Sequence, residues 1–378
     1  MKNLNELKSL IVLNNIPSLG TVRIKRLIDF FGSATNVLSA TEKELSYVEN
    51  IGPSIAKNIV MLKNKIDVQK EIDALNKEGI KLICYNDENY PLMLKYLSDQ
   101  PMLLYVKGEL KSEDMISVSI VGTRKPTSYG RLVVEHIVKQ LAKYNLTIVS
   151  GLAYGIDTLA HEFAIKNGLR TIAVLGNGLS VYYPIANKKL QDKIPLYGAV
   201  ISEFPYFYKP NKNSFPQRNR IIAALSLGTI VIEADIQSGA MITAKFAAEL
   251  GKDVFAVPGS IFSKQSKGTN FLIKTGAKLV SSAEDVIEEI QKLSEILKHQ
   301  TVINKTFVNQ NEDEEKLDEE TKKVLDIIVS EPNGLHIDKI QSISSLEITK
   351  LMNILFNLVM NGKIKELTGK IYVPVNNN

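Results

Sequence analysis

The feature that most constrains the fold is a regular alternation of short apolar runs and amphipathic segments between about residues 110 and 290. Six runs have the length of buried strands, and the segments between them carry apolar residues at helical spacing. Strands that alternate with helices pair in parallel, with helices on both faces of the sheet. We therefore predict an α/β fold with an open, doubly wound parallel sheet. The runs are ISVSIVG, LTIVSG, TIAVLG, GAVISE, TIVIEA and DVFAVPG.

The segments before and after this core have different patterns. Residues 1–75 contain short helical patterns, and two of them follow the turns IPSLG and VENIG, which is typical of a helix-hairpin-helix or SAM-like domain. Such hairpins can present backbone amides to a DNA phosphate, or they can be inert packing elements. Residues 76–109 are expected to lead into the sheet and to pack on it, so that the core spans 76–295.

The end of the chain predicts a second, smaller domain. Residues 296–316 are polar and close with the acidic run NQNEDEEK, so we expect a solvated linker. Residues 317–378 then show three helical segments and a short hairpin, which indicate a winged helix. Its recognition helix, from Ser345 to about Asn361, holds few cations, so binding of DNA or of a protein partner both remain open.

Composition excludes several classes of protein. The single cysteine, Cys84, allows no disulfide framework and no cysteine-based metal site. The chain begins without a secretory pattern and contains no apolar stretch long enough to span a bilayer, so we expect a soluble cytoplasmic protein with no membrane partner. The net charge of +5 permits a nucleic-acid partner without requiring one.

Glycine-containing loops follow several of the expected strands. Ligands of open parallel sheets bind beyond the carboxyl ends of the strands, where helix N-termini attract anions. The loop GTRKPTSYG, from Gly122 to Gly130, supplies hydroxyls, two cations and close backbone approach, as a phosphate site requires. Ser238 is a plausible N-cap after the strand TIVIEA, and it would direct the amides of Gly239 and Ala240 at the same crevice.

The most informative segment is FPYFYKPNKNSFPQRNR, residues 204–220. Four cations alternate with aromatic rings, and no acidic residue interrupts them. Cations can follow a phosphate chain while exposed rings stack on unpaired bases, so this segment predicts a contact with single-stranded nucleic acid. Phe215 is the ring that we expect to be exposed. The cations are Lys209, Lys212, Arg218 and Arg220.

No motif in the chain indicates catalysis. Asp157 and His161 are spaced four residues apart and could act as an acid–base pair, but a polar network that fixes their helix is the preferred interpretation. The GNG turn at Gly176 is a weak dinucleotide signal, because the third glycine is missing. The sequence contains no P-loop, no HExxH, no GxSxG and no cluster of metal ligands. We therefore expect neither a cofactor nor a metal.

The loop motifs together resemble the DNA-processing protein A (DprA/Smf) family. The resemblance covers about residues 85–282 with high specificity and is looser at both ends. One departure is Thr123, where the family usually has serine, which keeps the hydroxyl. The motifs are GTRKPTSYG, SGLAYGIDTLAHEFAI, VLGNGLSVYYP, ISEFP, FPQRNRIIAALS, VIEADIQSGAMITAKFAAELGKDVFAVPG and KGTNFLIKTGAKLV.

The resemblance implies a non-enzymatic, Rossmann-like core that binds single-stranded DNA. It also implies that the protein protects incoming DNA during natural transformation, loads the RecA recombinase onto it and forms a homodimer. Carried over by motif, the DNA site would comprise Gly122, Thr123, Arg124, Lys212, Phe215, Arg218, Asn219, Arg220 and Lys252, beside Ser238 and Gly239 from the loop analysis.

Two alternative functions are compatible with parts of the sequence. The core also resembles phosphoribohydrolases that release bases from nucleoside monophosphates, whose loop PGGxGTxxE ends in a catalytic glutamate. Phe246 occupies the position of that glutamate here, which argues against this chemistry. The other alternative is a regulator that binds duplex DNA through its winged helix.

Overall fold

The computed structural model describes residues 4–290, 319–331, 334–360, 363–367 and 371–374. The expected acidic linker, residues 296–316, lies outside the described residues. The chain divides into two compact units, residues 1–296 and 297–378, and each is considered by itself. Among the described residues, no helix is both long and apolar enough to cross a membrane.

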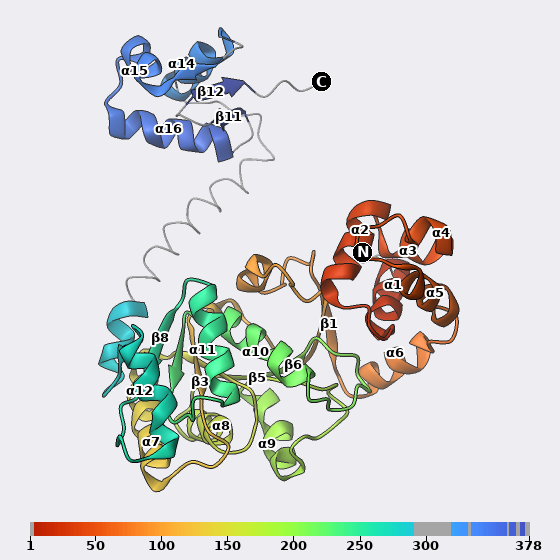
Figure 1. The fold of residues 1–378 in the computed structure, drawn as a ribbon, viewed down its shortest axis with the longest axis vertical. Coiled ribbons are helices and arrows are strands. Elements are labelled where there is room, and N and C mark those ends of the chain that lie inside the picture. The colour runs from red at the N-terminus through yellow and green to blue at the C-terminus, as the bar shows by residue number, and fades with distance from the viewer. Residues whose placement is uncertain (1–3, 291–318, 332–333, 361–362, 368–370, 375–378) are drawn as a thin grey trace. The chain divides into compact units, whose positions relative to one another are not determined.

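The first unit begins with six helices (Figure 1). The turns before α2 and α5 have nearly the same backbone geometry: Gly20 and Gly52 are N-caps with φ −72° and ψ 167° or 168°. Arg23 joins the two turns by donating to the carbonyl oxygens of Ser18 and Asn50, at 3.0 and 3.2 Å. The helices are α1 (Leu4–Asn15), α2 (Thr21–Phe31), α3 (Ala34–Ser39), α4 (Glu42–Leu45), α5 (Pro53–Leu62) and α6 (Val68–Lys77).

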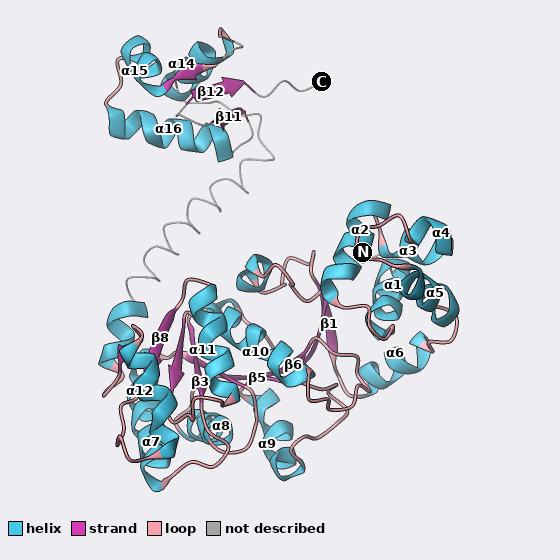
Figure 2. Cartoon of the chain, in the orientation of Figure 1, coloured by secondary structure: helices cyan, strands magenta, loops and turns pink. Residues whose placement is uncertain are grey.

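A nine-stranded sheet forms the centre of the same unit (Figure 2). All six expected runs form strands, β3 to β8, and each pairs in parallel with its neighbours among β3–β9. The α/β class and the mostly parallel sheet are therefore confirmed. The strands, in chain order, are β1 (Lys81–Cys84), β2 (Leu103–Gly108), β3 (Ser117–Val121), β4 (Thr147–Ser150), β5 (Thr171–Val174), β6 (Gly198–Ser202), β7 (Gly228–Val231), β8 (Asp253–Ala256) and β9 (Lys278–Leu279).

The lead-in segment adds an antiparallel edge to this sheet. β1 pairs with β2, and β2 pairs with β6, both antiparallel. Residues 76–109 were expected to pack on the sheet. Their strands β1 and β2 join the sheet itself, while Leu94, between them, is buried in the core beside it. The full order is β1-β2-β6-β5-β4-β3-β7-β8-β9.

Helices connect the parallel strands. α7 packs against α8, and α10 packs against α11. Because β3 to β6 progress in one direction from β3 and β7 to β9 in the other, right-handed crossovers place these two pairs on opposite faces. The helices are α7 (Ser128–Leu141), α8 (Ile156–Lys166), α9 (Lys188–Lys193), α10 (Ser214–Leu225), α11 (Gly239–Glu249) and α12 (Lys267–Lys274). Short 3₁₀ turns are η1 (Leu92–Tyr96), η2 (Ser112–Met115), η3 (Ala142–Tyr144), η4 (Ile185–Asn187), η5 (Ile194–Leu196) and η6 (Lys264–Ser266).

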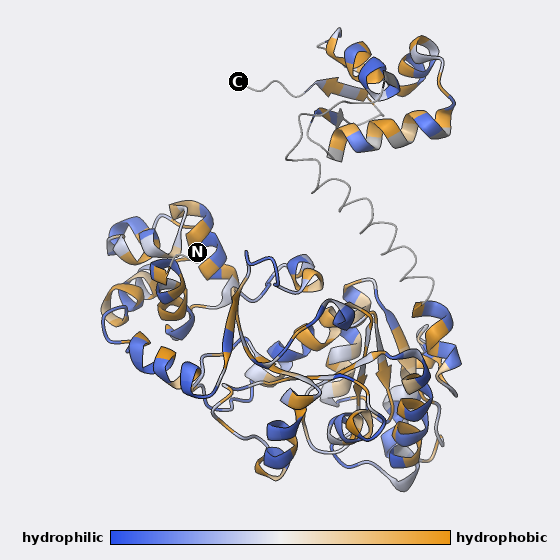
Figure 3. Cartoon of the chain, turned by 180° about the vertical axis from the view of Figure 1, so that it is seen from behind, coloured by the Kyte–Doolittle hydropathy of each residue, from blue (hydrophilic) through white to orange (hydrophobic). Residues whose placement is uncertain are grey.

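The strand order reverses between the neighbouring strands β3 and β7: strands β4 to β6 follow on one side of β3, and β8 and β9 follow on the far side of β7. β3 and β7 are fully buried, and their loops diverge to opposite faces of the sheet. Such a switch point leaves a crevice at the carboxyl ends of the two strands, which is where open α/β sheets bind ligands. Figure 3 shows the hydrophobic colouring of the strands and the mixed colouring of the helices that cover them.

The second unit is a small α/β body with its own core. Its antiparallel sheet has the order β10-β12-β11. Val324, Ile340 and Leu351, one from each helix, are fully buried in a shared apolar cluster. The elements are α14 (Glu319–Val329), β10 (Leu335–His336), α15 (Ile337–Ser344), α16 (Ile348–Met360), β11 (Ile364–Leu367) and β12 (Ile371–Pro374).

Candidate functional site

A cavity of about 760 Å³ lies at the switch point between β3 and β7. Its volume falls within the range of roughly 300 to 1,000 Å³ that is usual for ligand sites. It is lined by the loops after β3, β4 and β7, by the first turns of α10 and α11, and by the start of η6. The lining includes Gly122, Thr123, Arg124, Lys125, Asp157, Tyr183, Lys212, Phe215, Arg218, Asn219, Asp235, Ser238, Gly239, Thr243, Lys264 and Gln265.

The loop after β3 is fixed by its neighbour β7. The Thr123 amide donates to the carbonyl oxygen of Glu233 at 2.6 Å. The amide and the hydroxyl of Thr127 both donate to the Glu233 carboxylate, at 2.9 and 2.6 Å. Arg124 and Lys125 sit between these anchors with exposed side chains. The loop therefore presents two cations from a backbone that is already held in place.

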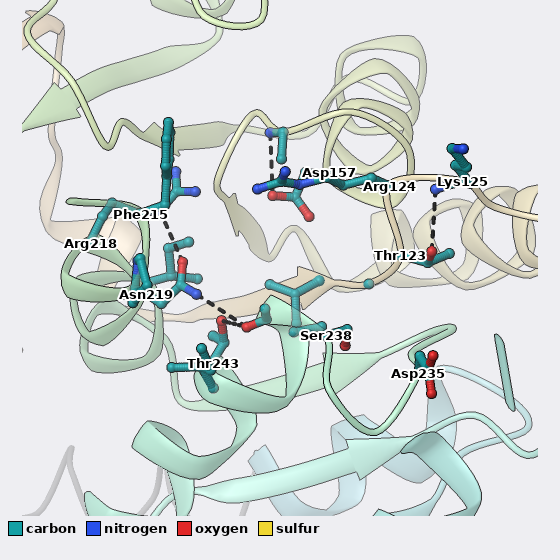
Figure 4. A pocket seen from close by; sticks show the side chains of 18 of the residues that line it. Thr123, Arg124, Lys125, Asp157, Phe215, Arg218, Asn219, Asp235, Ser238 and Thr243 are labelled. Atoms are coloured by element: carbon teal, nitrogen blue, oxygen red, sulfur yellow. Dashed lines mark hydrogen bonds between the residues drawn. The ribbon is translucent and has the colours of Figure 1, made fainter. Parts of the chain in front are cut away.

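Helix α10 contributes five residues to the cavity wall, Pro216 and four others that share one face. Phe215, Arg218, Asn219 and Ile222 all line the cavity. Their spacing of three, four and seven residues is that of a single helical face. Figure 4 shows Phe215, Arg218 and Asn219 on this helix, across the pocket from Arg124 and Asp157.

Arg218 forms a buried wall of the pocket. Its guanidinium donates to the carbonyl oxygen of Gly151 at 2.6 Å and to that of Val174, and Nε donates to Oδ1 of Asn219 at 3.1 Å. A Cβ atom at position 151 would lie 2.6 Å from Nη2, so the close approach requires glycine. Burial lowers the pKa of Arg218 to about 10, which leaves it charged at neutral pH. Its charge stabilises strand ends and also faces the cavity.

Asp157 and His161 were expected to belong to a polar network that fixes their helix on the sheet. His161 is fully buried, and its Nδ1 lies 2.7 Å from Oγ1 of Thr171. Burial lowers the pKa of His161 to about 3, so it is neutral at physiological pH. Asp157 lines the cavity, where burial raises its pKa and the charge of Arg218 opposes that rise. The hydrogen bond between His161 and Thr171 of β5 joins α8 to the sheet, as that interpretation expects, whereas Nε2 of His161 is buried without a hydrogen-bond partner among the described residues.

An aromatic pair closes one side of the pocket. The rings of Phe215 and Tyr183 are 5.2 Å apart between centroids, with an interplanar angle of 31°. Phe215 is half-buried rather than exposed, because its ring packs closely against Gly176. A Cβ atom at that position would lie 2.6 Å from the ring. Tyr183 is 46% exposed. The pair offers a ring surface at the rim of the cavity and not the isolated exposed ring that was expected.

The N-terminus of α11 lies opposite α10. Ser238 is its N-cap, as predicted, but its side chain makes no capping hydrogen bond. Oγ of Ser238 is buried without a hydrogen-bond partner among the described residues. Asn219 connects the two helices by donating to the carbonyl oxygen of Gly239 at 3.2 Å. The backbone of Gly239 is open, since nothing lies within 4 Å of a Cβ placed there.

Two predicted DNA contacts are corrected by the structure. The side chain of Arg220 is 2% exposed and forms 2.7 Å ion pairs with Asp99 and Glu203. Lys252 donates its ammonium protons to the carbonyl oxygens of Ala223, Ala224 and Ser226 at the end of α10. Burial lowers the pKa of Lys252 to about 7. Neither residue lines the cavity, because both charges are used inside the protein.

Three cations of the pocket remain available to a ligand. Arg124, Lys125 and Lys212 are exposed, and their side chains make no ion pair or hydrogen bond with the residues that the structure describes. Lys264 differs, since its Nζ lies 3.3 Å from the Asp235 carboxylate. The mouth of the cavity is thus positively charged, which suits an anionic ligand.

Some pocket residues were missed by sequence reasoning. Tyr183 belongs to the sequence motifs of the family, yet it was not predicted to be part of the site. Lys125 was one of the two cations expected in the Gly122–Gly130 loop, but it was not among the residues carried over to the DNA site. Thr243 follows Gly239 by four residues, so its helical spacing could have indicated it. Asp235 and Lys264 gave no such signal. Within the described ranges, no cluster of three or more His, Cys, Asp or Glu side chains could hold a metal ion.

Comparison with known proteins identifies the family. The model of the family described as DNA recombination-mediator protein A matches residues 81–291, more than half of the chain. The chain belongs to this family. The DNA processing protein DprA of Streptococcus pneumoniae is 47% identical over 219 residues, which cover 57% of this chain and 77% of that protein. Protein Smf of Synechocystis is 32% identical over 385 residues, 95% of this chain and 96% of its own.

Two solved structures of family members resemble this one. The X-ray structure of DprA from Streptococcus pneumoniae has a TM-score of 0.63 and 37% identity, over 76% of this chain and 99% of that chain. DNA processing protein A from Helicobacter pylori has a TM-score of 0.50 and 33% identity, over 56% and 96% respectively. The second structure is described as giving insight into a single-stranded DNA binding mode.

Proposed function

We propose that this recombination mediator binds single-stranded DNA in the cavity between β3 and β7. The observation that carries the proposal is the set of three exposed cations, Arg124, Lys125 and Lys212, beside the Phe215–Tyr183 ring pair. Cations follow the phosphate chain and rings stack on unpaired bases, so this combination suits single strands better than duplexes. The described DNA-binding mode of the Helicobacter pylori relative supports the same substrate.

The contacts have separate roles in this proposal. Arg124, Lys125 and Lys212 neutralise phosphates, and the N-terminus of α11 offers amides to one of them. The Phe215 ring stacks on a base. Arg218 and Asn219 fix the walls of the pocket, and Gly239 leaves open space for the DNA backbone to approach closely. Gly122 instead permits close packing against Ile156 and the Glu233 carbonyl within the protein. The predicted site is thereby kept, without Arg220 and Lys252.

The biological role follows from the family. A recombination mediator delivers DNA to a recombinase, and we propose that RecA is the recombinase and that the protein protects incoming strands in the cytoplasm during natural transformation. We also propose a homodimer of a Rossmann-like core. No residue of the recombinase or dimer surface is assigned.

The terminal regions receive proposals of their own. The matching turns before α2 and α5 support a helix-hairpin-helix or SAM-like domain within residues 1–75. The order of three helices and a small sheet, α14 to β12, supports a winged helix within residues 317–378. A DNA-binding measurement on the full chain and on a variant without residues 317–378 distinguishes a DNA contact of that domain, which would lower affinity when removed, from a protein contact, which would not.

We propose that the chain is not an enzyme. Phe246 of α11 stands where phosphoribohydrolases place their catalytic glutamate. The protein is incubated with nucleoside monophosphates, and release of the free base is followed. No release above the rate of a buffer control is expected. A steady rate of base release would contradict the proposal.

A salt titration tests the main function. Binding of a fluorescent oligothymidylate is followed by anisotropy at several salt concentrations, with the matching duplex alongside. Tighter binding of the single strand, weakened by salt, is expected. Equal or tighter binding of the duplex would shift the site to the terminal regions. A failure to bind either would refute the proposal.

A further inference from the structure

The loop between β8 and α12 exposes two consecutive apolar side chains. Ile261 is 77% exposed and Phe262 is 92% exposed, the largest exposed fraction of any large apolar side chain in the described part of the chain. Burial of a phenylalanine ring stabilises a folded protein, and this ring contributes no such stabilisation. Isolated exposed apolar residues are common, so the surroundings of the ring decide its meaning.

The backbone of this loop is firmly anchored. The Gly259 amide donates to Oδ1 of Asn270 at 3.2 Å, and Nδ2 of Asn270 donates back to the Gly259 carbonyl at 2.9 Å. The Ser263 amide donates to the Ser260 carbonyl at 3.0 Å, which closes a turn around the two apolar residues. Phe262 is therefore held in solvent by a fixed turn and not by a loose segment.

The turn ends at the mouth of the cavity. Lys264 and Gln265, two and three residues after Phe262, both line it. The Ala234 amide donates to the Gln265 carbonyl at 2.6 Å, which ties the loop to the end of β7. Two residues span at most about 7 Å, so Phe262 lies at the rim. The exposed Ile236, next to Asp235, lies on the adjoining loop.

Cations accompany the exposed ring. The Lys264 side chain is 76% exposed and pairs with Asp235 at 3.3 Å, and Lys267 is exposed at the start of α12. Exposed rings next to cations along a groove are the arrangement that binds single strands without sequence preference. The ring gives a base a surface, and Lys267 gives a phosphate a counter-charge.

We infer that Phe262 is a second base-stacking position, which receives a nucleotide as the single strand leaves the cavity past Lys264. The inference rests on the proposed function of that cavity. The occupant is an unpaired base, since an exposed ring beside cations favours a polyanion with flat apolar surfaces over an apolar partner. A second copy of this chain is the competing occupant.

A tryptophan reporter tests the inference directly. The chain contains no tryptophan, so Phe262→Trp gives fluorescence from this position alone. Addition of a long oligothymidylate is expected to quench it. Phe215→Trp serves as the matched reporter for the cavity. Quenching at position 215 without any change at position 262 would overturn the inference and leave the proposed function intact. No quenching at either position, with no binding of a labelled oligonucleotide, would overturn both.

Affinity provides an independent readout. Phe262→Ala is expected to weaken binding of a long oligonucleotide on the order of ten-fold, with an unchanged salt slope because no charge is removed. The shortest oligonucleotide that binds should be unaffected. Tyr96→Ala, which removes another exposed ring, is the control. Equal affinities of Phe262→Ala and wild type would overturn the inference. Fluorescence of the Phe262→Trp variant that changes with protein concentration in the absence of DNA would overturn it in favour of contact between copies.

Discussion

The three free cations at the mouth of the cavity allow a quantitative prediction. Replacement of Arg124, Lys125 and Lys212 by alanine removes up to three phosphate contacts, since each side chain is exposed and none is paired with a described residue. On single strands each contact contributes about 0.7 to the slope of log K against log salt, so the slope should fall by about 2.1. When salt is raised from roughly 50 to 200 mM, the ratio of wild-type affinity to variant affinity should therefore fall about 18-fold.

The assay is fluorescence anisotropy of a labelled oligothymidylate over that salt range. The control variant replaces Lys139, Lys143 and Lys166 by alanine. It removes the same charge from the last turn of α7, from η3 and from the last turn of α8, which lie away from the pocket. The control should lose little affinity, and its slope should match that of the wild type. If both variants had the same slope, the affinity loss would reflect net charge, and the assignment of phosphate contacts to this pocket would be refuted.

Further predictions concern single side chains. Phe215→Ala should weaken single-strand binding by about 1–3 kcal/mol in the same assay, as loss of one stacked base requires, and unchanged affinity would exclude stacking there. Arg220→Met should reduce the free energy of unfolding in urea by about 3–5 kcal/mol, because it leaves buried Glu203 without its partner, and the salt slope of binding should not change. His161→Gln should reduce the acid sensitivity of folding. The pKa of His161 is about 3 in the folded state and near 6.5 in the unfolded state, so the wild type loses stability as pH falls below 6.5. Parallel curves of unfolding free energy against pH for both proteins would contradict this.

The sheet and the place of its site were predictable for a physical reason. Strands buried on both faces are apolar runs, and the five fully buried strands β3 to β7 were all visible in the sequence, as was the partly buried β8. Their loops meet at one edge, so the loops at Gly122 and Ser238 could be expected to share a site without knowledge of the strand order. The edge formed by β1 and β2 was not predicted, because its pairing with β6 spans almost a hundred residues.

Helix α10 was the main omission, and it explains the error at Arg220. Residues 204–220 contain three prolines and were not predicted to form a helix, but Pro216 lies in the first turn of α10, where its missing amide proton does no harm. Phe215, Arg218 and Asn219 then share a face, whereas Arg220 is two residues beyond Arg218 and points about 200° away from it. Once the helix is known, its 3.6-residue period alone distinguishes the residues that face the pocket from Arg220, which forms the ion pair with Glu203.

The cations of this region form two groups: Arg220 is buried and Lys252 is half-buried, whereas Arg124, Lys125 and Lys212 are exposed at the mouth of the cavity. Arg220 and Lys252 stabilise helix α10, which forms one wall of the cavity that the exposed cations surround. Lys252 donates to three carbonyl oxygens at the end of α10, where a positive charge also stabilises the negative end of the helix dipole. Arg220 holds the middle of the same helix through Glu203. The first turns of α10, which carry Phe215 and Arg218, are thereby held against the cavity. A count of cations in the sequence cannot distinguish the two groups, because both consist of lysine and arginine near glycine-rich loops. Burial distinguishes them: only cations that are exposed at the mouth should contribute to the salt dependence of DNA binding.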